Sequence, residues 1–262
     1  MEFLQGVEPA VLAVLCVAAF CAGALDAVVG GGGLVQIPAL FLALPNAAVP
    51  SLLGTSKLAG VWGTGVAAWR YSKAVHNAWP VVLPAAGAAF GGSFLGAITV
   101  TLLPGDFVRR LLPLILALVA LYTFRRKDFG RHHQPVAVDG RALAVAGVIG
   151  AGIGFYDGFF GPGTGSFLMF AFVRVFGFDF LHASAGAKVV NVACNVAALI
   201  WFGLGGHYLL AVALVMAVCN VFGSTVGSAL AIRRGSDFVR KIFLVVVLLL
   251  IVRTAYDAWW RG

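Results

Sequence analysis

The chain of 262 residues is 61% hydrophobic and only 11% charged, and its formal net charge is +8. A soluble domain is about half apolar and about a quarter charged, so water alone cannot accommodate this composition. The basic excess lies mostly in predicted loops, where it carries information on membrane topology and indicates no nucleic-acid partner. We therefore expect an all-α, polytopic membrane protein that is surrounded by the lipid bilayer.

Apolar stretches of helical length follow one another along the chain, and two of them stop at runs rich in glycine. The runs are Gly30-Gly31-Gly32-Gly33 and Gly161-Pro162-Gly163-Thr164-Gly165. Each run follows a long apolar stretch and precedes a short one, which predicts a helix hairpin that enters the membrane and returns. The expected helices are 9–29, 34–44, 51–70, 79–102, 107–124, 142–160, 166–176, 182–203, 208–231 and 238–256.

The second half of the chain repeats the first half without a gap, at a constant offset of 131 positions. The matched residues are Asp26 with Asp157, Lys57 with Lys188, His76 with His207, Gly92-Ser93 with Gly223-Ser224, and Asp106 to Arg110 with Asp237 to Lys241. We therefore divide the chain into a first transmembrane repeat (1–124), a basic linker (125–141) and a second transmembrane repeat (142–262). Two copies of one membrane unit are a common plan of secondary transporters.

The basic residues predict how the two repeats are oriented. Linker 125–141 is the most basic loop, so we expect it to be cytoplasmic. The loop at 70–76 is basic in the first repeat, whereas the second repeat is basic at the opposite loop, 233–241. This change of sides predicts two inverted-topology repeats. Arg109 and Arg110 would then lie outside, against the general trend.

The glycine runs are candidate binding elements. A helix that starts again inside the membrane has free N–H groups and about half a positive charge at its N-terminus, which suits an anion. The alternative is that the glycines only permit close packing of helices. No strand–helix unit and no Walker lysine accompany the runs, so they are a poor match to a nucleotide-binding loop. The candidate substrate-binding residues are Gly31, Gly32, Gly33, Gly163, Thr164 and Gly165.

Lys57 and Lys188 place a positive charge in an apolar helix of each repeat. A charge in the membrane costs roughly 2.5–3.5 kcal/mol on insertion scales, so each lysine requires a partner. That partner is either an anionic substrate or a carboxylate of Asp26 or Asp157. The two aspartates are either fixed counter-charges or groups that bind and release a coupling proton. The sequence leaves both pairs of alternatives open.

One helix of the second repeat carries a polar stripe on an otherwise apolar segment. Its members are Ser184, Lys188, Asn191 and Asn195, which share one face of a helix at spacings i, i+4, i+7 and i+11. Their counterparts in the first repeat are Leu53, Lys57, Gly60 and Thr64, which are smaller or less polar. We therefore expect Asn191 and Asn195 to bind substrate, and the two halves need not contribute equally.

Other reactive residue types predict no chemistry. The adjacent His132 and His133 lack a third ligand, so we expect no metal. The cysteines fall in apolar segments without a CxxC pair and are interpreted as small buried hydrophobic residues; they are Cys16, Cys21, Cys194 and Cys219. No catalytic set with suitable spacing is present, so we expect neither an enzyme nor a cofactor.

Three segments resemble a known family of bacterial membrane proteins. They are Gly23-Ala24-Leu25-Asp26-Ala27-Val28-Val29-Gly30-Gly31-Gly32-Gly33-Leu34, Thr55-Ser56-Lys57-Leu58 and Gly154-Phe155-Tyr156-Asp157-Gly158-Phe159-Phe160-Gly161-Pro162. They are similar to the TauE/SafE sulfite exporter family, also called the 4-toluene sulfonate uptake permeases, in its YfcA-like branch. The resemblance covers about residues 10 to 257. It implies an inner-membrane transporter of sulfite, of organosulfonates such as sulfoacetate, or of other sulfur compounds.

Together these features predict a multi-pass transporter in the bacterial inner membrane. A small anion, a sulfur oxyanion or an organosulfonate, would bind between the repeats and cross by alternating access. Glycine N–H groups, the two lysines and Thr164, Asn191 and Asn195 would hold it. The alternatives are an anion channel and a transporter of a non-sulfur anion. The oligomeric state is left open, including a homodimer.

Overall fold

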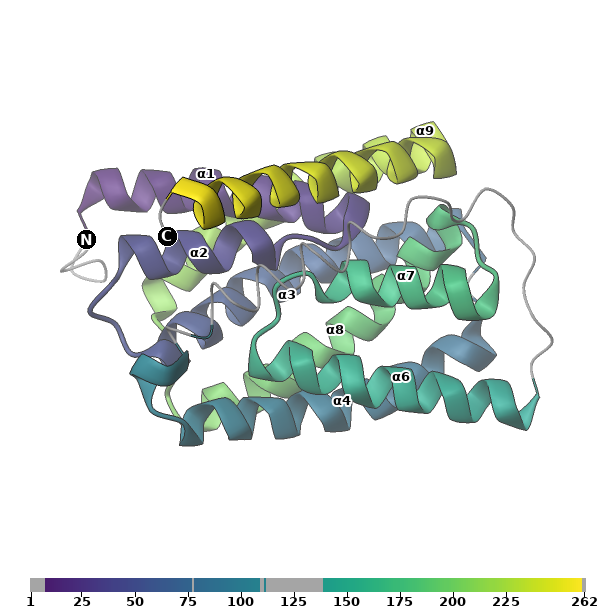
Figure 1. Cartoon of the computed structure of the whole chain (residues 1–262), viewed down its shortest axis with the longest axis horizontal. Coiled ribbons are helices and arrows are strands. Elements are labelled where there is room, and N and C mark those ends of the chain that lie inside the picture. Colours follow the sequence, from purple (N-terminus) through teal and green to yellow (C-terminus); the bar gives the residue numbers. More distant parts are fainter. Residues whose placement is uncertain (1–7, 77, 109–110, 112–138, 261–262) are drawn as a thin grey trace.

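The computed structural model describes residues 8–76, 78–108, 111 and 139–260, with the backbone alone at 240 and 243–260. Every secondary-structure element in these ranges is a helix (Figure 1). They are α1 (Pro9–Val29), α2 (Gly33–Ala43), α3 (Val49–Ala74), α4 (Trp79–Leu102), α6 (Gly140–Phe159), α7 (Thr164–Phe176), α8 (Phe180–Leu204) and α9 (Leu210–Trp260). Most of the helix expected at 107–124 lies outside the described residues, as do Arg109, Arg110, His132, His133 and nearly all of the linker.

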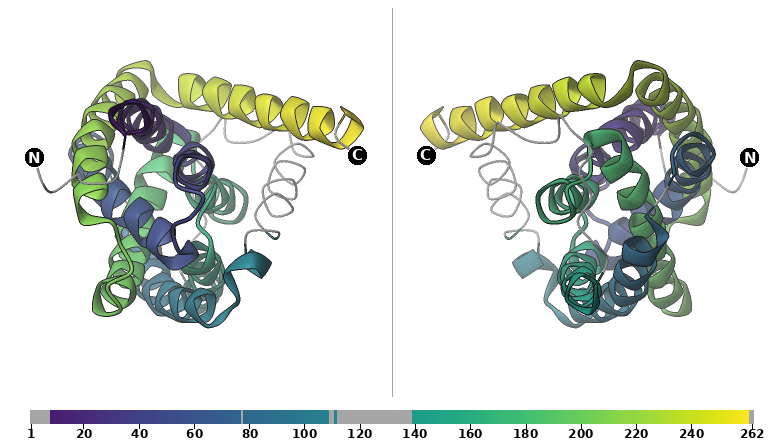
Figure 2. Two further views of the ribbon diagram at one scale, coloured as in Figure 1. Left: turned by 90° about the vertical axis from the view of Figure 1, so that its left-hand side faces the viewer. Right: turned by 90° about the vertical axis from the view of Figure 1, so that its right-hand side faces the viewer.

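The end of the chain differs from the expected pair of helices at 208–231 and 238–256. α9 is one element whose backbone breaks at Gly235, with φ 71° and ψ −167°. A residue without a Cβ tolerates this conformation, so the break falls at a glycine. Beyond the break α9 extends away from the other described helices, as both views of Figure 2 show.

Five described segments are long and apolar enough to cross a membrane: α1, α4, α6, α8 and Leu210–Val239 of α9. α3 also has the length, at 26 residues, but polar side chains such as Lys57 make it less apolar. α2 and α7 have 11 and 13 residues, which is too short for a hydrocarbon layer of about 30 Å. They follow the glycine breaks and fold back beside α1 and α6 (Figure 1). The polytopic all-α prediction is confirmed.

The outer surface carries large apolar side chains from several helices. Trp62 of α3 is 57% exposed, Val148 of α6 is 74% exposed and Phe222 of α9 is 64% exposed. Lipid tails accommodate such a surface, whereas water does not. Cys21 is also exposed, so the prediction that all four cysteines are buried is wrong for this residue. It lies on the outer side of α1, where a small apolar group suits lipid.

The buried apolar side chains form two clusters, one toward each end of the helix bundle. One cluster joins the end of α3 (Val75) with the start of α6 (Ala146). The other joins residues near the start of α1 (Leu15) with the start of α3 (Val49) and the end of α8 (Phe202). α1 and α6 therefore start at opposite ends of the bundle (Figure 1). An inverted repeat requires this arrangement, while the orientation relative to a membrane stays a prediction.

Basic side chains collect at the end of the bundle where α6 starts. We call this the basic end; its residues lie at the end of α3, the start of α6, the end of α7 and the break in α9. They are Arg70, Lys73, Arg141, Arg174, Arg233 and Arg234. Under the positive-inside rule we expect this end to face the cytoplasm, together with the predicted linker.

Matching glycines allow close helix crossings. A Cβ on Gly92 of α4 would overlap the backbone of α6 at Ala151, and one on Gly223 of α9 would overlap α1 at Phe20. Both residues of the first crossing lie 131 positions from their counterparts in the second. α4 therefore packs on α6 as α9 packs on α1, so each crossing joins the two repeats.

Two buried serines form matching hydrogen bonds between the repeats. Ser93 Oγ donates to the carbonyl of Cys194 at 2.8 Å, and Ser224 Oγ donates to the carbonyl of Gly63 at 2.5 Å. All four residues match at the same offset. A serine of each repeat therefore bonds to the backbone of a helix in the other repeat: α4 bonds to α8, and α9 bonds to α3.

Candidate substrate site

The two glycine breaks touch each other at the centre of the protein. Ser166 donates through its N–H to the carbonyl of Gly30 at 3.3 Å and through Oγ to the carbonyl of Val29 at 2.7 Å. A Cβ on Gly30 would overlap the backbone of Gly165, and one on Gly165 would overlap Gly30. Gly30 also has a φ of 75°, which other residues rarely adopt. At these positions the glycines are required for packing, the alternative that the sequence left open.

Local hydrogen bonds shape the second break. Gly161 and Gly163 have φ of 93° and 81°, so the chain turns sharply between α6 and α7. Thr164 Oγ1 donates to the carbonyl of Gly161 at 2.9 Å, and Tyr156 donates its hydroxyl to the carbonyl of Pro162 at 2.5 Å. The backbone carbonyls released by the break thus find partners within the protein, as they must in a membrane.

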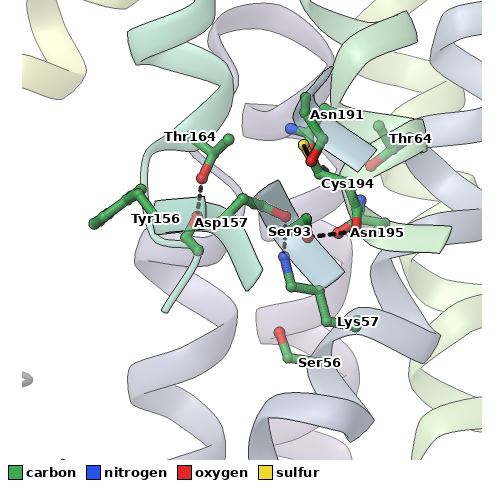
Figure 3. A network of polar contacts seen from close by, with 12 residues as sticks. Ser56, Lys57, Thr64, Ser93, Tyr156, Asp157, Thr164, Asn191, Cys194 and Asn195 are labelled. Atoms are coloured by element: carbon green, nitrogen blue, oxygen red, sulfur yellow. Dashed lines mark hydrogen bonds and ion pairs between the residues drawn. The ribbon is translucent and has the colours of Figure 1, made fainter. Parts of the chain in front are cut away.

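Two ion pairs connect the repeats beside the breaks. Lys57 of the first repeat pairs with Asp157 of the second, and Figure 3 shows the two side chains pointing toward each other. Lys188 of the second repeat pairs with Asp26 of the first, with Nζ and Oδ2 3.1 Å apart. Each lysine therefore has a carboxylate partner from the opposite repeat. The four groups carry a formal charge of zero in total.

The two pairs differ in their surroundings. The Lys188 side chain is 1% exposed, and its partner Asp26 also accepts a hydrogen bond from Thr64 Oγ1 at 3.2 Å. The Lys57 side chain is 8% exposed and Asp157 is 2% exposed. A buried ion pair is stable only where hydrogen bonds satisfy the remaining donors and acceptors. The Asp26 pair has such an extra bond, and both pairs border open space, one through Asp26 and the other through Lys57 and Asp157.

That space is a cavity of about 50 Å³ between the repeats. Its wall contains three of the four paired charged residues, namely Asp26, Lys57 and Asp157. Glycines of both breaks also line it, together with the side-chain amides of four residues. The amides belong to Gln36, Asn191, Asn195 and Asn220. Charged and amide groups around a small central space are typical of a binding site for a polar ligand.

Several predicted site residues meet at this cavity and several do not. Those on its wall are Gly32, Gly33, Lys57, Asn191 and Asn195, with Asp26 and Asp157. Those that do not line it are Gly31, Gly163, Thr164, Gly165 and Lys188. Thr164 bonds locally, Gly165 packs on the other break, and Lys188 lies behind Asp26.

The same wall carries a buried amide network that was not predicted from the sequence. Gln36 Nε2 donates to the carbonyl and to Oγ of Ser56, at 2.8 and 3.1 Å. Asn220 Nδ2 donates to Gln36 Oε1 at 3.0 Å and to the carbonyl of Ala19 at 3.2 Å. A signal was available, since Gln36 is the one amide residue in α2 and Asn220 the one in the membrane-crossing part of α9.

The wall offers more hydrogen-bond donors than its own contacts use. Asn195 Nδ2 donates to Asn191 Oδ1 at 3.3 Å, which uses one of the four amide hydrogens of this pair. Within the described residues, the ammonium group of Lys57 bonds only to Asp157, so two of its three hydrogens are available. The hydroxyl of Ser56 accepts from Gln36 and retains its own proton. These donors match a ligand that is rich in acceptors.

Known proteins similar to this chain are membrane transporters. The family model for the sulfite exporter TauE/SafE matches residues 15–254. A probable membrane transporter protein, ORF9, of a Sinorhizobium species is 38% identical over 248 residues, covering 94% of this chain and 93% of that protein. The probable membrane transporter protein YfcA of Escherichia coli K12 is 34% identical, covering 96% and 92%.

A probable membrane transporter protein of Haemophilus influenzae is 31% identical, covering 95% of this chain and 96% of that protein. No solved structure matches the chain. The family match spans both repeats, both glycine breaks and both ion pairs. The chain therefore belongs to the TauE/SafE family and is a multi-pass membrane transporter.

Proposed function

We propose that this transporter moves a small anion, a sulfur oxyanion or an organosulfonate, across the bacterial inner membrane. The observation that carries the proposal is the set of unused donors around the central cavity. They come from Lys57, Ser56, Asn191 and Asn195, and they converge from α3 and α8. An anion accepts from several donors at once, and charge-assisted hydrogen bonds are the strong ones.

The size of the cavity favours the smaller members of this class. One water requires about 10–15 Å³ on the same measure, so 50 Å³ accommodates about three to five non-hydrogen atoms. A simple oxyanion of sulfur fits within this limit. A longer organosulfonate such as sulfoacetate fits only if the repeats separate further. The name of the family model, sulfite exporter, agrees with a small sulfur oxyanion.

The two lysines have different roles in this proposal. Lys57 contacts the anion, because its ammonium group lies on the cavity wall with hydrogens to spare. Lys188 holds Asp26 in place and has no direct contact, because it lies behind that carboxylate. Asn191 and Asn195 orient the oxygens of the anion from one face of α8.

The position of the cavity between the two predicted inverted repeats supports alternating access as the mechanism. Rocking of one repeat against the other would open the cavity first to one side and then to the other. The basic end would face the cytoplasm. An anion channel would require a continuous polar path instead, and its flux would not saturate.

Thermal unfolding of the purified protein with a panel of anions tests the proposal. The panel holds sulfite, sulfate, thiosulfate, methanesulfonate, sulfoacetate and two carboxylates. At about 100 times its Kd a ligand adds roughly 2.7 kcal/mol of stability, which is visible in a melting curve. We expect stabilisation by a small sulfur anion that Lys57→Met abolishes and Lys188→Met reduces less. Unchanged melting with every anion would refute the proposal, and stabilisation by a carboxylate alone would favour a non-sulfur substrate.

A further inference from the structure

We propose that each anion binds together with one proton, and that Asp157 takes this proton. The inference rests on the proposed function and adds the coupling ion to it. It is carried by the charge balance of the ion-pair quartet and by the different contacts of its two carboxylates.

The charge balance comes first. Asp26, Lys57, Asp157 and Lys188 are paired and sum to zero, and among the described residues the cavity wall holds no other charge. A bound monovalent anion would leave one uncompensated negative charge in a region surrounded by lipid. Uncompensated charge is strongly unfavourable there, so a site that binds an anion must gain a positive charge or neutralise a carboxylate. One proton restores the balance.

The geometry then assigns the proton to Asp157. Lys57 is the cation on the described cavity wall, so a bound anion competes with Asp157 for the positive charge of its ammonium group. Asp157 then loses its counter-charge, and its side chain is only 2% exposed to solvent. Asp26 is in a different position, because Lys188 and Thr64 continue to hold it. The carboxylate released by substrate binding is therefore Asp157.

No other described group can replace Lys57 beside this carboxylate. Lys188 of α8 is bound to Asp26, which is itself negative and faces the same cavity from α1. The other titratable neighbours are Tyr156 on the same helix and Cys194 on α8, and neither carries a positive charge. The hydroxyls of Ser93 on α4 and of Thr164 on α7 donate to backbone carbonyls.

The exchange balances in atoms and in charge. The anion replaces Asp157 as the partner of the Lys57 ammonium, and a proton from solvent joins the Asp157 carboxylate. No covalent bond other than this O–H forms or breaks. The loaded site carries the same net charge as the empty site. The electrostatic free energy of the alternating-access movement is therefore similar in both states. Transport of a monovalent anion is then electroneutral, with one proton moved in the same direction.

Methanesulfonate is a suitable probe, since it is small, monovalent and fully ionised at every pH used. Proton uptake on binding is measured with a pH-indicator dye in weakly buffered detergent solution near pH 7. We expect about one proton per bound anion for the unmodified protein. The apparent affinity for methanesulfonate should fall about tenfold per pH unit as the pH rises. Binding that requires one proton becomes weaker as the proton concentration falls.

The variant Asp157→Asn resembles the protonated state. We expect it to bind methanesulfonate with no proton uptake and with an affinity that is independent of pH. Asp139→Asn is the control, because Asp139 is an exposed aspartate at the start of α6 and does not line the cavity; it should retain both the uptake and the pH dependence. The measurement on the unmodified protein does not depend on either variant being stable.

The outcomes separate the two proposals. Binding without proton uptake overturns this inference and leaves the anion site intact. Proton uptake that persists in Asp157→Asn overturns the assignment to Asp157. A failure of methanesulfonate to bind at all overturns the proposed anion site and this inference with it.

Discussion

Gln36 of the first repeat and Phe167 of the second occupy matching positions after the two glycine breaks, yet their surroundings have little in common. Gln36 is 3% exposed and hydrogen-bonds to Ser56 and Asn220 on the cavity wall. Phe167 packs edge-on against Tyr156, with ring centroids 5.5 Å apart. The residues that match Ser56 and Asn220 are also apolar, namely Ala187 and Ala89.

α3 and α8 show the reverse difference. The second repeat supplies Asn191 and Asn195, whereas the first supplies Gly60 and Thr64 at the matching positions. A Cβ on Gly60 would meet nothing within 4 Å, because the cavity lies beside it. The duplicated features are thus the breaks, the ion pairs and the glycine crossings, which build the protein. The features present once surround one cavity, and we infer that they select the substrate.

The shared architecture is most sensitive at the contact between the two breaks. The methyl group of Gly30→Ala would overlap the backbone of Gly165, and the alanine would have to adopt a positive φ. Overpacking and left-handed strain together should destabilise the fold by about 2–5 kcal/mol, measured by thermal unfolding in detergent. Gly152→Ala is the control, because nothing lies within 4 Å of its Cβ. Equal melting temperatures for the two variants would contradict this account.

The ion pairs should differ in their response to the loss of a lysine. Lys57→Met leaves Asp157 buried without a partner, which should cost about 3–5 kcal/mol of stability. Lys188→Met should cost less, since Asp26 is 14% exposed and keeps Thr64. The double variant Lys57→Met/Asp157→Asn should recover most of the loss. A larger effect at Lys188 would reverse the assigned roles.

The amide network offers a test of what distinguishes the repeats. Gln36→Leu leaves the partner groups of Ser56 and Asn220 unsatisfied, which should cost about 1–3 kcal/mol. We expect anion affinity to fall about tenfold as well, measured by titration with methanesulfonate. Phe167→Leu, at the matching position, should affect packing alone and leave affinity unchanged. Similar losses of affinity in both variants would show that the network has no special role.

The opposite directions of the repeats can be checked with little effect on function. Asn46 follows α2 and Arg174 lies near the end of α7, and both are exposed. In a cysteine-free background, Asn46→Cys should react with an impermeant maleimide from outside and Arg174→Cys only from the cytoplasm. Permeabilised cells provide the control in which both positions react. Labelling of both from one side of intact cells would rule out inverted repeats.

Much of the architecture was predictable because its signals are local. Apolar length and the positions of glycine and proline predict where α1 to α4 and α6 to α8 begin and end, within a few residues. Gly235 interrupts α9 where two separate helices were expected, since a single flexible residue bends the chain without a connecting loop. The internal repeat also singles out both lysines and both aspartates, because each charge recurs at the same offset within an apolar stretch.

Contacts between distant parts of the chain required the tertiary structure. The sequence left the partner of Lys57 open between an anionic substrate and a carboxylate, and only the fold brings Lys57 of α3 to Asp157 of the opposite repeat. Gln36, Ser56 and Asn220 are isolated polar residues in sequence, and they become one network because α2, α3 and α9 converge.

The same reason separates the glycines that pack against another helix from those that leave room for the cavity. All of them look equivalent along the chain, since each lacks a side chain. Gly30 and Gly165 are in contact, whereas Gly60 borders the cavity with open space beside it. The helices, the duplication and the charges within apolar segments were predictable from the sequence alone, because these features depend on neighbours along the chain. The pairing of those charges and the location of the cavity depend on distances across the bundle, which only the fold decides.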